Sequence, residues 1–347
     1  MSLSLNVAVA LLPVLVFLGL LFFLDSFKLV SPRSVLFALL AGAGAGVAGA
    51  EASEWLVVAT RLGPAPLSRY VAPLVEEGLK AVWVVVLVRR GRIGFLVDAA
   101  ILGFAVGTGF ALVENVEYLW ELAEPRLLLW LVRGVGTAIL HGATTAIFAI
   151  LAKAFTDRHP ARPVLALLPG FLAATIVHSL YNHFLLPPIL AAAVLLVALP
   201  LLVIAVFARS ERTTRDWLGV GLDTDLDLVE TIVSGQALET RVGEYLRSLK
   251  AHFPGELVAD MLCLLRIQAE LAIRAKGLLL AREAGLEAPV GEDVSANLRE
   301  LRYLEKSIGR TGLLALKPIL RRSARDLWQV HLLEEAGARG DLTGPRT

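Results

Sequence analysis

Long apolar runs, separated by short charged connections, occupy the first two thirds of the chain. Each run comes close to the roughly 20 residues that a helix needs to cross a bilayer. The first run lacks a basic n-region and a small-residue cleavage site, so we interpret it as a retained helix and not as a signal peptide. The pattern predicts about seven membrane-spanning helices, at residues 5–24, 34–56, 70–88, 95–119, 134–154, 164–185 and 187–208.

The pattern changes at about residue 211, where ordinary charged sequence begins. Apolar residues recur there at helical spacing, as in Leu257 and Met261. Helices are predicted at residues 225–251, 255–284 and 293–337, with breaks at Pro254 and at residues 285–291. We therefore predict an all-α fold with two domains: a polytopic transmembrane helix bundle at residues 1–210 and a C-terminal α-helical domain at residues 211–347.

Composition supports a membrane protein and narrows the chemistry. Apolar residues make up 56% of the chain and the mean hydropathy is +0.68, which excludes an ordinary soluble enzyme. The net charge is +1 and no basic block contains interleaved aromatic residues, so we predict no nucleic-acid binding. Cys263 is the single cysteine, which excludes an intrachain disulfide and a cysteine-based zinc cluster. A metal would therefore need histidine and carboxylate ligands.

Lysine and arginine residues are distributed unequally between the two sets of connections. One set carries eleven and the other carries four, the latter being Arg61, Arg69, Arg126 and Arg133. Because basic residues accumulate on the cytoplasmic side, we predict an N-terminus outside and a C-terminal domain in the cytoplasm. Residues 126–133 have charged ends around a tryptophan, and we predict that this segment lies along the membrane interface.

Two carboxylates and one ammonium group, those of Glu76, Glu77 and Lys80, lie inside the third predicted span. Each charge near the bilayer centre costs about 2.5–3.5 kcal/mol, so these side chains need partners, water or a metal. At about 100° per residue, Lys80 lies about 40° from Glu76 and about 60° from Glu77 around the helix. We predict that the face they share points into the protein.

Three other predicted spans carry polar residues at a similar depth. Glu114, His141 and His178 lie within roughly one helical turn of the two glutamates in depth, about 10 Å below the outer surface. Gly103 and Gly107 begin a stripe of small residues that Glu114 continues, which places this carboxylate on the closely packed side of its helix. Four spans would thus bring glutamates and histidines to one level.

Carboxylates and histidines in a pocket of low dielectric constant suit the activation of water. A buried glutamate can take a proton from water, and imidazoles can hold a divalent metal or donate to a developing oxyanion. We predict hydrolysis of a peptide bond inside the membrane. The predicted roles are Glu76 or Glu77 as general base, Glu114, His141 and His178 as metal ligands or oxyanion-side groups, Lys80 as a charge partner, and Asn115 and Asn182 as orienting hydrogen bonders. Zinc suits such a ligand set best among the common ions.

The same residues permit two other interpretations. Intramembrane Glu, His and Lys also mark ion pathways, so a transporter or proton relay is an alternative, although we find no inverted repeat and no matched pair of broken helices. A non-catalytic scaffold would keep the polar cluster for helix packing. Convergence of the histidines and carboxylates within metal-ligand reach favours the enzyme, whereas separation by more than about 8 Å favours the scaffold.

Four motifs in these spans resemble those of a known family and occur in the same order. They are EExxK at residues 76–80, GxxFxxxEN at 107–115, an isolated His-Gly at 141–142 and HxxxN at 178–182. Together they are similar to the PrsW family of bacterial intramembrane proteases, which is related to the CAAX-prenyl protease-like membrane enzymes. The resemblance covers about residues 70–185, and Tyr181 stands where the family has tryptophan.

The resemblance implies that the paired glutamates, Glu114 and the two histidines form the active site, with a metal ion. It also implies a multi-pass protein of the bacterial cytoplasmic membrane that cuts a membrane-anchored protein, such as an anti-sigma factor. The predicted depth of the site places this cleavage near the outer leaflet. The C-terminal domain lies outside the resemblance, which therefore says nothing about its cytoplasmic partner.

Overall fold

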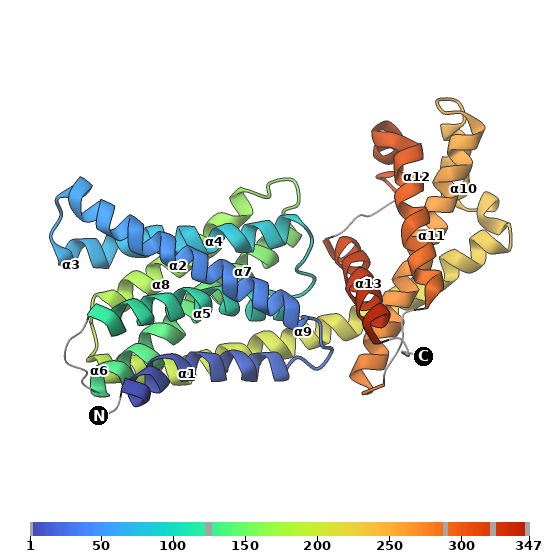
Figure 1. Ribbon diagram of the computed structural model, residues 1–347. Coiled ribbons are helices and arrows are strands. Elements are labelled where there is room, and N and C mark those ends of the chain that lie inside the picture. The colour runs from blue at the N-terminus through green and yellow to red at the C-terminus, as the bar shows by residue number, and fades with distance from the viewer. Residues whose placement is uncertain (1–2, 122–126, 287–290, 320–323, 344–347) are drawn as a thin grey trace. The chain divides into compact units, whose positions relative to one another are not determined.

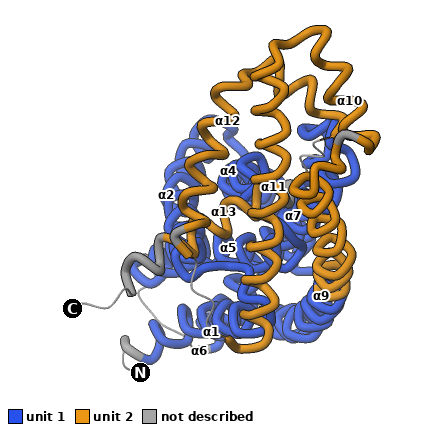
Figure 2. The backbone as a smooth tube through the Cα atoms, turned by 90° about the vertical axis from the view of Figure 1, so that its right-hand side faces the viewer, with its two compact units in different colours: residues 1–210 blue, residues 211–347 orange. Residues whose placement is uncertain are grey.

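The computed structural model describes residues 3–121, 127–286, 291–319 and 324–343. All regular structure within these residues is helical, so the predicted all-α fold is confirmed. The chain divides into two compact units, residues 1–210 and residues 211–347, which Figure 2 shows in different colours. α9 (Pro188–Val233) crosses the boundary between them as one continuous helix.

The first unit is a bundle of long helices that run side by side in Figure 1. These are α1 (Leu3–Phe23), α2 (Pro32–Thr60), α4 (Ala72–Arg89), α5 (Leu96–Glu121), α7 (Ala138–Arg158) and α8 (Leu168–Asn182), together with the first part of α9. Its short elements are α3 (Pro64–Pro66), the π-helical η1 (Leu67–Val71), α6 (Leu127–Leu131), the π-helical η2 (Val132–Thr137) and η3 (Leu165–Leu167).

Six helices among the described residues are long and apolar enough to cross a membrane. They are Leu5–Phe23, Pro32–Thr60, Leu96–Trp120, Leu128–Arg158, Leu165–Asn182 and Pro188–Val233. The remaining predicted span, residues 70–88, corresponds to α4 and the end of η1. α4 carries the charged Glu76, Glu77, Lys80 and Arg89, so by length and composition there are six candidate spans where the hydropathy pattern predicts seven.

The segment predicted to lie along the membrane interface is helical where the structure describes it. Arg126 lies outside the described residues, but residues 127–133 form α6 and the start of η2, which continue directly into α7. Trp130 and Arg133 are both buried inside the first unit. The charge at the end of this segment is satisfied by protein groups inside the bundle, and an interfacial position of the segment stays a prediction.

Glycines allow α5 to approach both of its main neighbours closely. A Cβ atom on Gly107 of α5 would overlap the carbonyl oxygen of His141 on α7. α2 meets the other side of α5 in the same way, since a Cβ atom on Gly42 would overlap the carbonyl oxygen of Val106. Small residues at such contacts are the usual means of close helix packing in membranes. The predicted packing role of the glycine stripe on α5 is confirmed, and it sets the distance between the helices that carry Glu114 and His141.

The second unit contains the end of α9, η4 (Gln236–Glu239), α10 (Arg241–Leu249), α11 (Gly255–Glu283), α12 (Glu292–Leu316) and α13 (Ala324–Thr343). Its core includes the fully buried Met261 and Leu264 of α11. The helix predicted at residues 225–251 is divided between α9 and α10, because the chain turns at Gly235 with a φ of 78°. The helix predicted at residues 293–337 is likewise divided, into α12 and α13.

Candidate active site

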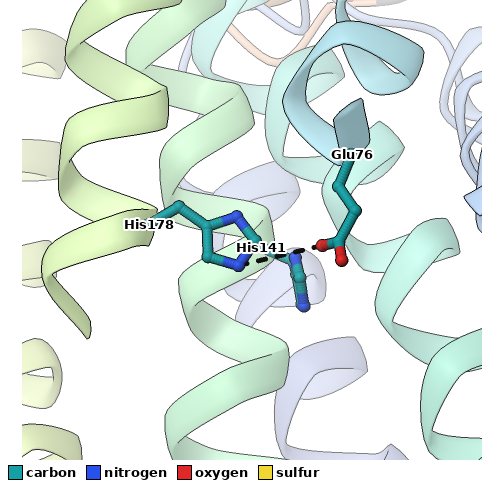
Figure 3. A group of neighbouring side chains, drawn as sticks. All are labelled: Glu76, His141 and His178. Carbon is teal, nitrogen blue, oxygen red and sulfur yellow. Dashed lines mark ion pairs between the residues drawn. The ribbon is translucent and has the colours of Figure 1, made fainter. Parts of the chain in front are cut away.

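Four helices of the first unit supply the polar side chains of the site. α4 supplies Glu76, Glu77 and Lys80, α5 supplies Glu114, α7 supplies His141, and α8 supplies His178. The structure joins these six side chains into one continuous network of ion pairs and hydrogen bonds. Figure 3 shows Glu76, His141 and His178 pointing toward one another from three different helices.

Glu76, His141 and His178 form a group that could hold a metal ion. One ligand atom from each lies within 4.8 Å of the others, which is the convergence expected of an enzyme and not of a packing scaffold. Oε2 of Glu76 is 3.8 Å from Nε2 of His178, the pair joined by a dashed line in Figure 3. Two imidazole nitrogens and one carboxylate oxygen fit a divalent ion such as zinc. This group contains Glu76 where the sequence predicts Glu114.

Glu77 occupies a different environment from its neighbour in the sequence. Its Oε1 accepts three hydrogen bonds, from Nζ of Lys80 at 2.6 Å, Oγ1 of Thr144 at 2.9 Å and Nδ1 of His178 at 2.9 Å. The Glu77 side chain is 2% exposed and that of Glu76 is 16% exposed. Because Nδ1 of His178 donates to Glu77, the neutral form of this ring carries its lone pair on Nε2, the nitrogen that faces Glu76. A carboxylate that fixes a histidine in this way is typical of metal sites.

His141 is held at both ring nitrogens. Its Nδ1 lies 3.1 Å from Nζ of Lys80, and its Nε2 lies 2.8 Å from Oε2 of Glu114. The His141 and His178 rings are nearly perpendicular, with centroids 4.9 Å apart and an interplanar angle of 88°. The hydroxyl of Thr145 donates to the carbonyl oxygen of His141 at 2.9 Å, which ties down the backbone at this position. The ring therefore has little freedom to turn.

Arg133 belongs to the network although the sequence places it in a surface connection. Its Nη2 is 3.2 Å from Oε1 of Glu114, its Nε donates to Oδ1 of Asn115 at 3.1 Å, and its guanidinium lies 3.4 Å from the ring centroid of Tyr118. The arginine side chain is only 10% exposed. It lies in η2, and π-helical turns often occur at functional sites. The signal in the sequence was Glu114, a carboxylate within a predicted span that needed a cation.

Of the two predicted asparagines, Asn115 joins this network through Arg133, and Asn182 bonds to a different segment. Asn115 accepts from Arg133 and donates to the carbonyl oxygen of Ala10 on α1 at 2.8 Å, so it anchors the arginine. Asn182 on α8 donates to the carbonyl oxygen of Ser68 in η1 at 2.9 Å. It therefore ties α8 to the π-helical turn that precedes α4, where a carbonyl group is available outside the regular helical pattern.

A bundle of apolar helices that encloses a buried glutamate and histidine group defines a membrane-embedded hydrolase of the metal-dependent class. A family model described as the PrsW family intramembrane metalloprotease matches residues 31–208. The chain belongs to this family and is a multi-pass membrane protein, as the motifs at residues 76–182 predict. No curated protein and no solved structure matches the chain.

Proposed function

We propose that this protein is an intramembrane endopeptidase that hydrolyses a peptide bond of a membrane-anchored protein, such as an anti-sigma factor, near the outer leaflet. The proposal is carried by one observation, the unequal environment of two adjacent glutamates. Oε1 of Glu77 accepts from three donors, and its side chain is 2% exposed. Glu76 faces Nε2 of His178 and its side chain is 16% exposed, so we assign the attacking water to Glu76 and not to Glu77.

Glu76 is the general base in this proposal. A carboxylate has two oxygens, so Glu76 can face His178 with one of them and accept a proton from the attacking water with the other. Glu77 is the residue that orients His178, and the sequence alone left the choice between these two glutamates open. Lys80 stays a charge partner, because its ammonium forms an ion pair with Glu77 and not with Glu76.

His141, His178 and Glu76 would hold the metal ion, and zinc suits their donor set. Such an ion, when bound, polarises the scissile carbonyl and stabilises negative charge that develops on its oxygen. Glu114 keeps the His141 ring in one orientation through Nε2, and Arg133 in turn fixes Glu114. These residues therefore position the ligand histidine and do not themselves meet the substrate.

The membrane arrangement follows from the distribution of charge along the chain. We propose that α4 is a seventh span, because the charged side chains within it, those of Glu76, Glu77 and Lys80, face partners inside the bundle. The excess of lysine and arginine in one set of connections supports an N-terminus outside and a C-terminal domain, residues 211–347, in the cytoplasm of a bacterial cell. The cytoplasmic partner of the C-terminal domain would then differ from the substrate, which reaches the site from the bilayer.

Cleavage of a tethered single-span substrate by the full chain in liposomes tests this function. Glu76→Ala removes the proton acceptor and is expected to lower the cleavage rate by about 10²–10⁴-fold. Glu54→Ala changes an exposed glutamate of α2 and is the matched control, with unchanged cleavage expected. Full activity of the Glu76→Ala variant would exclude Glu76 as the base, and no cleavage by the wild type would oppose the protease function.

A further inference from the structure

Lys80 is a fully buried cation at the centre of the site. Its side chain is 0% exposed, and its Nζ lies between Oε1 of Glu77 at 2.6 Å and Nδ1 of His141 at 3.1 Å. The ammonium also lies 4.8 Å from the centroid of the Phe110 ring, whose face favours a positive charge. Lys80 thus touches a histidine of the metal-binding group while it neutralises the carboxylate that orients the other histidine.

The chemistry of this contact fixes the protonation of His141. A lysine ammonium donates hydrogen bonds and cannot accept them, so Nδ1 of His141 must present its lone pair to Lys80. The neutral ring then carries its hydrogen on Nε2, which donates to Glu114 at 2.8 Å. The single lone pair that His141 offers is therefore already used by Lys80.

A metal ion on His141 is incompatible with this hydrogen bond, whichever ring nitrogen the ion uses. An ion on Nδ1 takes the lone pair that Lys80 now occupies. An ion on Nε2 moves the ring hydrogen to Nδ1, where it would face the hydrogens of the ammonium group. In both cases Lys80 must leave His141.

We propose that Lys80 is a resident cation that holds His141 when no metal is bound and that moves off Nδ1 when a divalent ion binds. Lys80 keeps Glu77 as its partner during this change, because that contact is short and lies within one turn of α4. The apparent metal affinity is then the intrinsic affinity multiplied by the fraction of molecules in which Lys80 has left His141. The inference rests on the metal-binding group of the proposed function and makes Lys80 a determinant of how tightly that group binds.

Zinc binding to the full chain in detergent tests the inference without any measurement of cleavage. The metal is removed with a chelator, and affinity is measured by competition with a chromophoric zinc indicator. Lys80→Met removes the competing ammonium and keeps an unbranched side chain that is one atom shorter, so zinc is expected to bind roughly tenfold more tightly or better. Lys80→Arg keeps a cation at this position, and its affinity is expected to stay within about threefold of the wild type.

Lys153→Met is the matched control for removal of a buried lysine, because Lys153 lies on α7 of the same unit and its ammonium pairs with Asp157 and not with His141. Its zinc affinity is expected to change by less than about threefold. An equal gain in Lys153→Met and Lys80→Met would overturn the inference, since the loss of any buried positive charge would then explain both. Size-exclusion chromatography establishes that each variant remains folded.

A structure of the zinc-loaded wild type decides the question if Lys80→Met does not fold. Zinc bound to His141 with Lys80 Nζ still at 3.1 Å from Nδ1 would overturn the inference, and a separated pair would support it. The proposed function fails independently. A wild type that cleaves substrate but binds no zinc overturns the inference and the zinc site but leaves the protease function. The expected affinity difference in a protein that cleaves nothing would remove only the protease function.

Discussion

Each unit of the molecule contains a buried lysine, and the two lysines have similar immediate partners. Lys80 in the first unit is 0% exposed and lies 2.6 Å from Glu77, and Lys276 in the second unit is 3% exposed and lies 2.5 Å from Asp225. Each ammonium also lies near an aromatic ring, 4.8 Å and 5.0 Å from the respective ring centroids. A buried lysine, its carboxylate and a nearby ring are therefore common to a candidate active site and to an ordinary helical domain.

The two ion pairs differ in the further contacts that their members make. Glu77 also fixes Nδ1 of His178, and Lys80 also contacts His141, so this ion pair controls two histidines that converge on Glu76. The Asp225 side chain is 21% exposed, so the ion pair of Lys276 and Asp225 is open to solvent. A buried ion pair is weak evidence for function by itself. It becomes informative when its members hold further groups in a geometry that can bind a ligand.

Replacing each lysine by methionine tests whether the two pairs differ as their surroundings indicate. Lys80→Met leaves Glu77 buried without its cation and is expected to destabilise the protein by about 3–5 kcal/mol. Lys276→Met is expected to cost roughly 1–2 kcal/mol, because water can reach Asp225. Denaturant unfolding of the full chain in one detergent, followed by circular dichroism, measures both. Equal losses would remove the contrast between the two pairs.

Much of the first unit could be predicted because bilayer-length apolar runs are an unambiguous signal. Counting residues along adjacent spans was also enough to predict that Glu114, His141 and His178 meet the glutamates of α4. The sequence could not place the end of α9, which continues to Val233 although the composition changes near residue 211. A helix persists across such a change because backbone hydrogen bonding does not require an apolar surface.

The sequence could not distinguish the roles of Glu76 and Glu77, and it did not place Arg133 in the site. Both features depend on packing between distant segments. Glu76 and Glu77 are adjacent, and only the donors that Thr144 and His178 bring from other helices distinguish them. Arg133 was counted among the connections because basic residues at the ends of apolar runs usually face headgroups. The π-helical turn at residues 132–137 instead carries it inward, and a local change of helical register leaves no clear pattern of apolar residues.

Arg133 provides a sharper test of the distinction between a positioning network and a structural ion pair. Arg133→Met is expected to lower cleavage by about 10–100-fold, because partners that orient a ligand histidine typically contribute that much. Arg133→Lys keeps a charge near Glu114 but cannot also serve Asn115 and the face of Tyr118, so partial recovery is expected. Both rates are measured with the tethered substrate in liposomes.

The control is Arg215→Met in the second unit, which removes an exposed arginine paired with Glu211 and Glu283. Such pairs contribute about 0–1 kcal/mol, so unchanged cleavage and nearly unchanged stability are expected. Wild-type cleavage by a folded Arg133→Met variant would show that Arg133 supports only the packing of the bundle. In that case the contacts that join Arg133 to His141 through Glu114 would have only a structural role, like the ion pair of Lys276 and Asp225.

Two glycines give the finest comparison between the units, because the same small change should have opposite effects. Gly107→Ala adds a methyl group that overlaps the carbonyl oxygen of His141, so α5 and α7 must separate, with an expected loss of about 1–3 kcal/mol. Gly277→Ala on α11 meets nothing within 4 Å and should gain up to about 1 kcal/mol from helix propensity. Thermal unfolding in one detergent compares the two, and zinc affinity should fall only in Gly107→Ala, since only that change displaces His141. A Gly107→Ala variant as stable as the wild type would mean that the close contact of α5 and α7 does not set the position of the site.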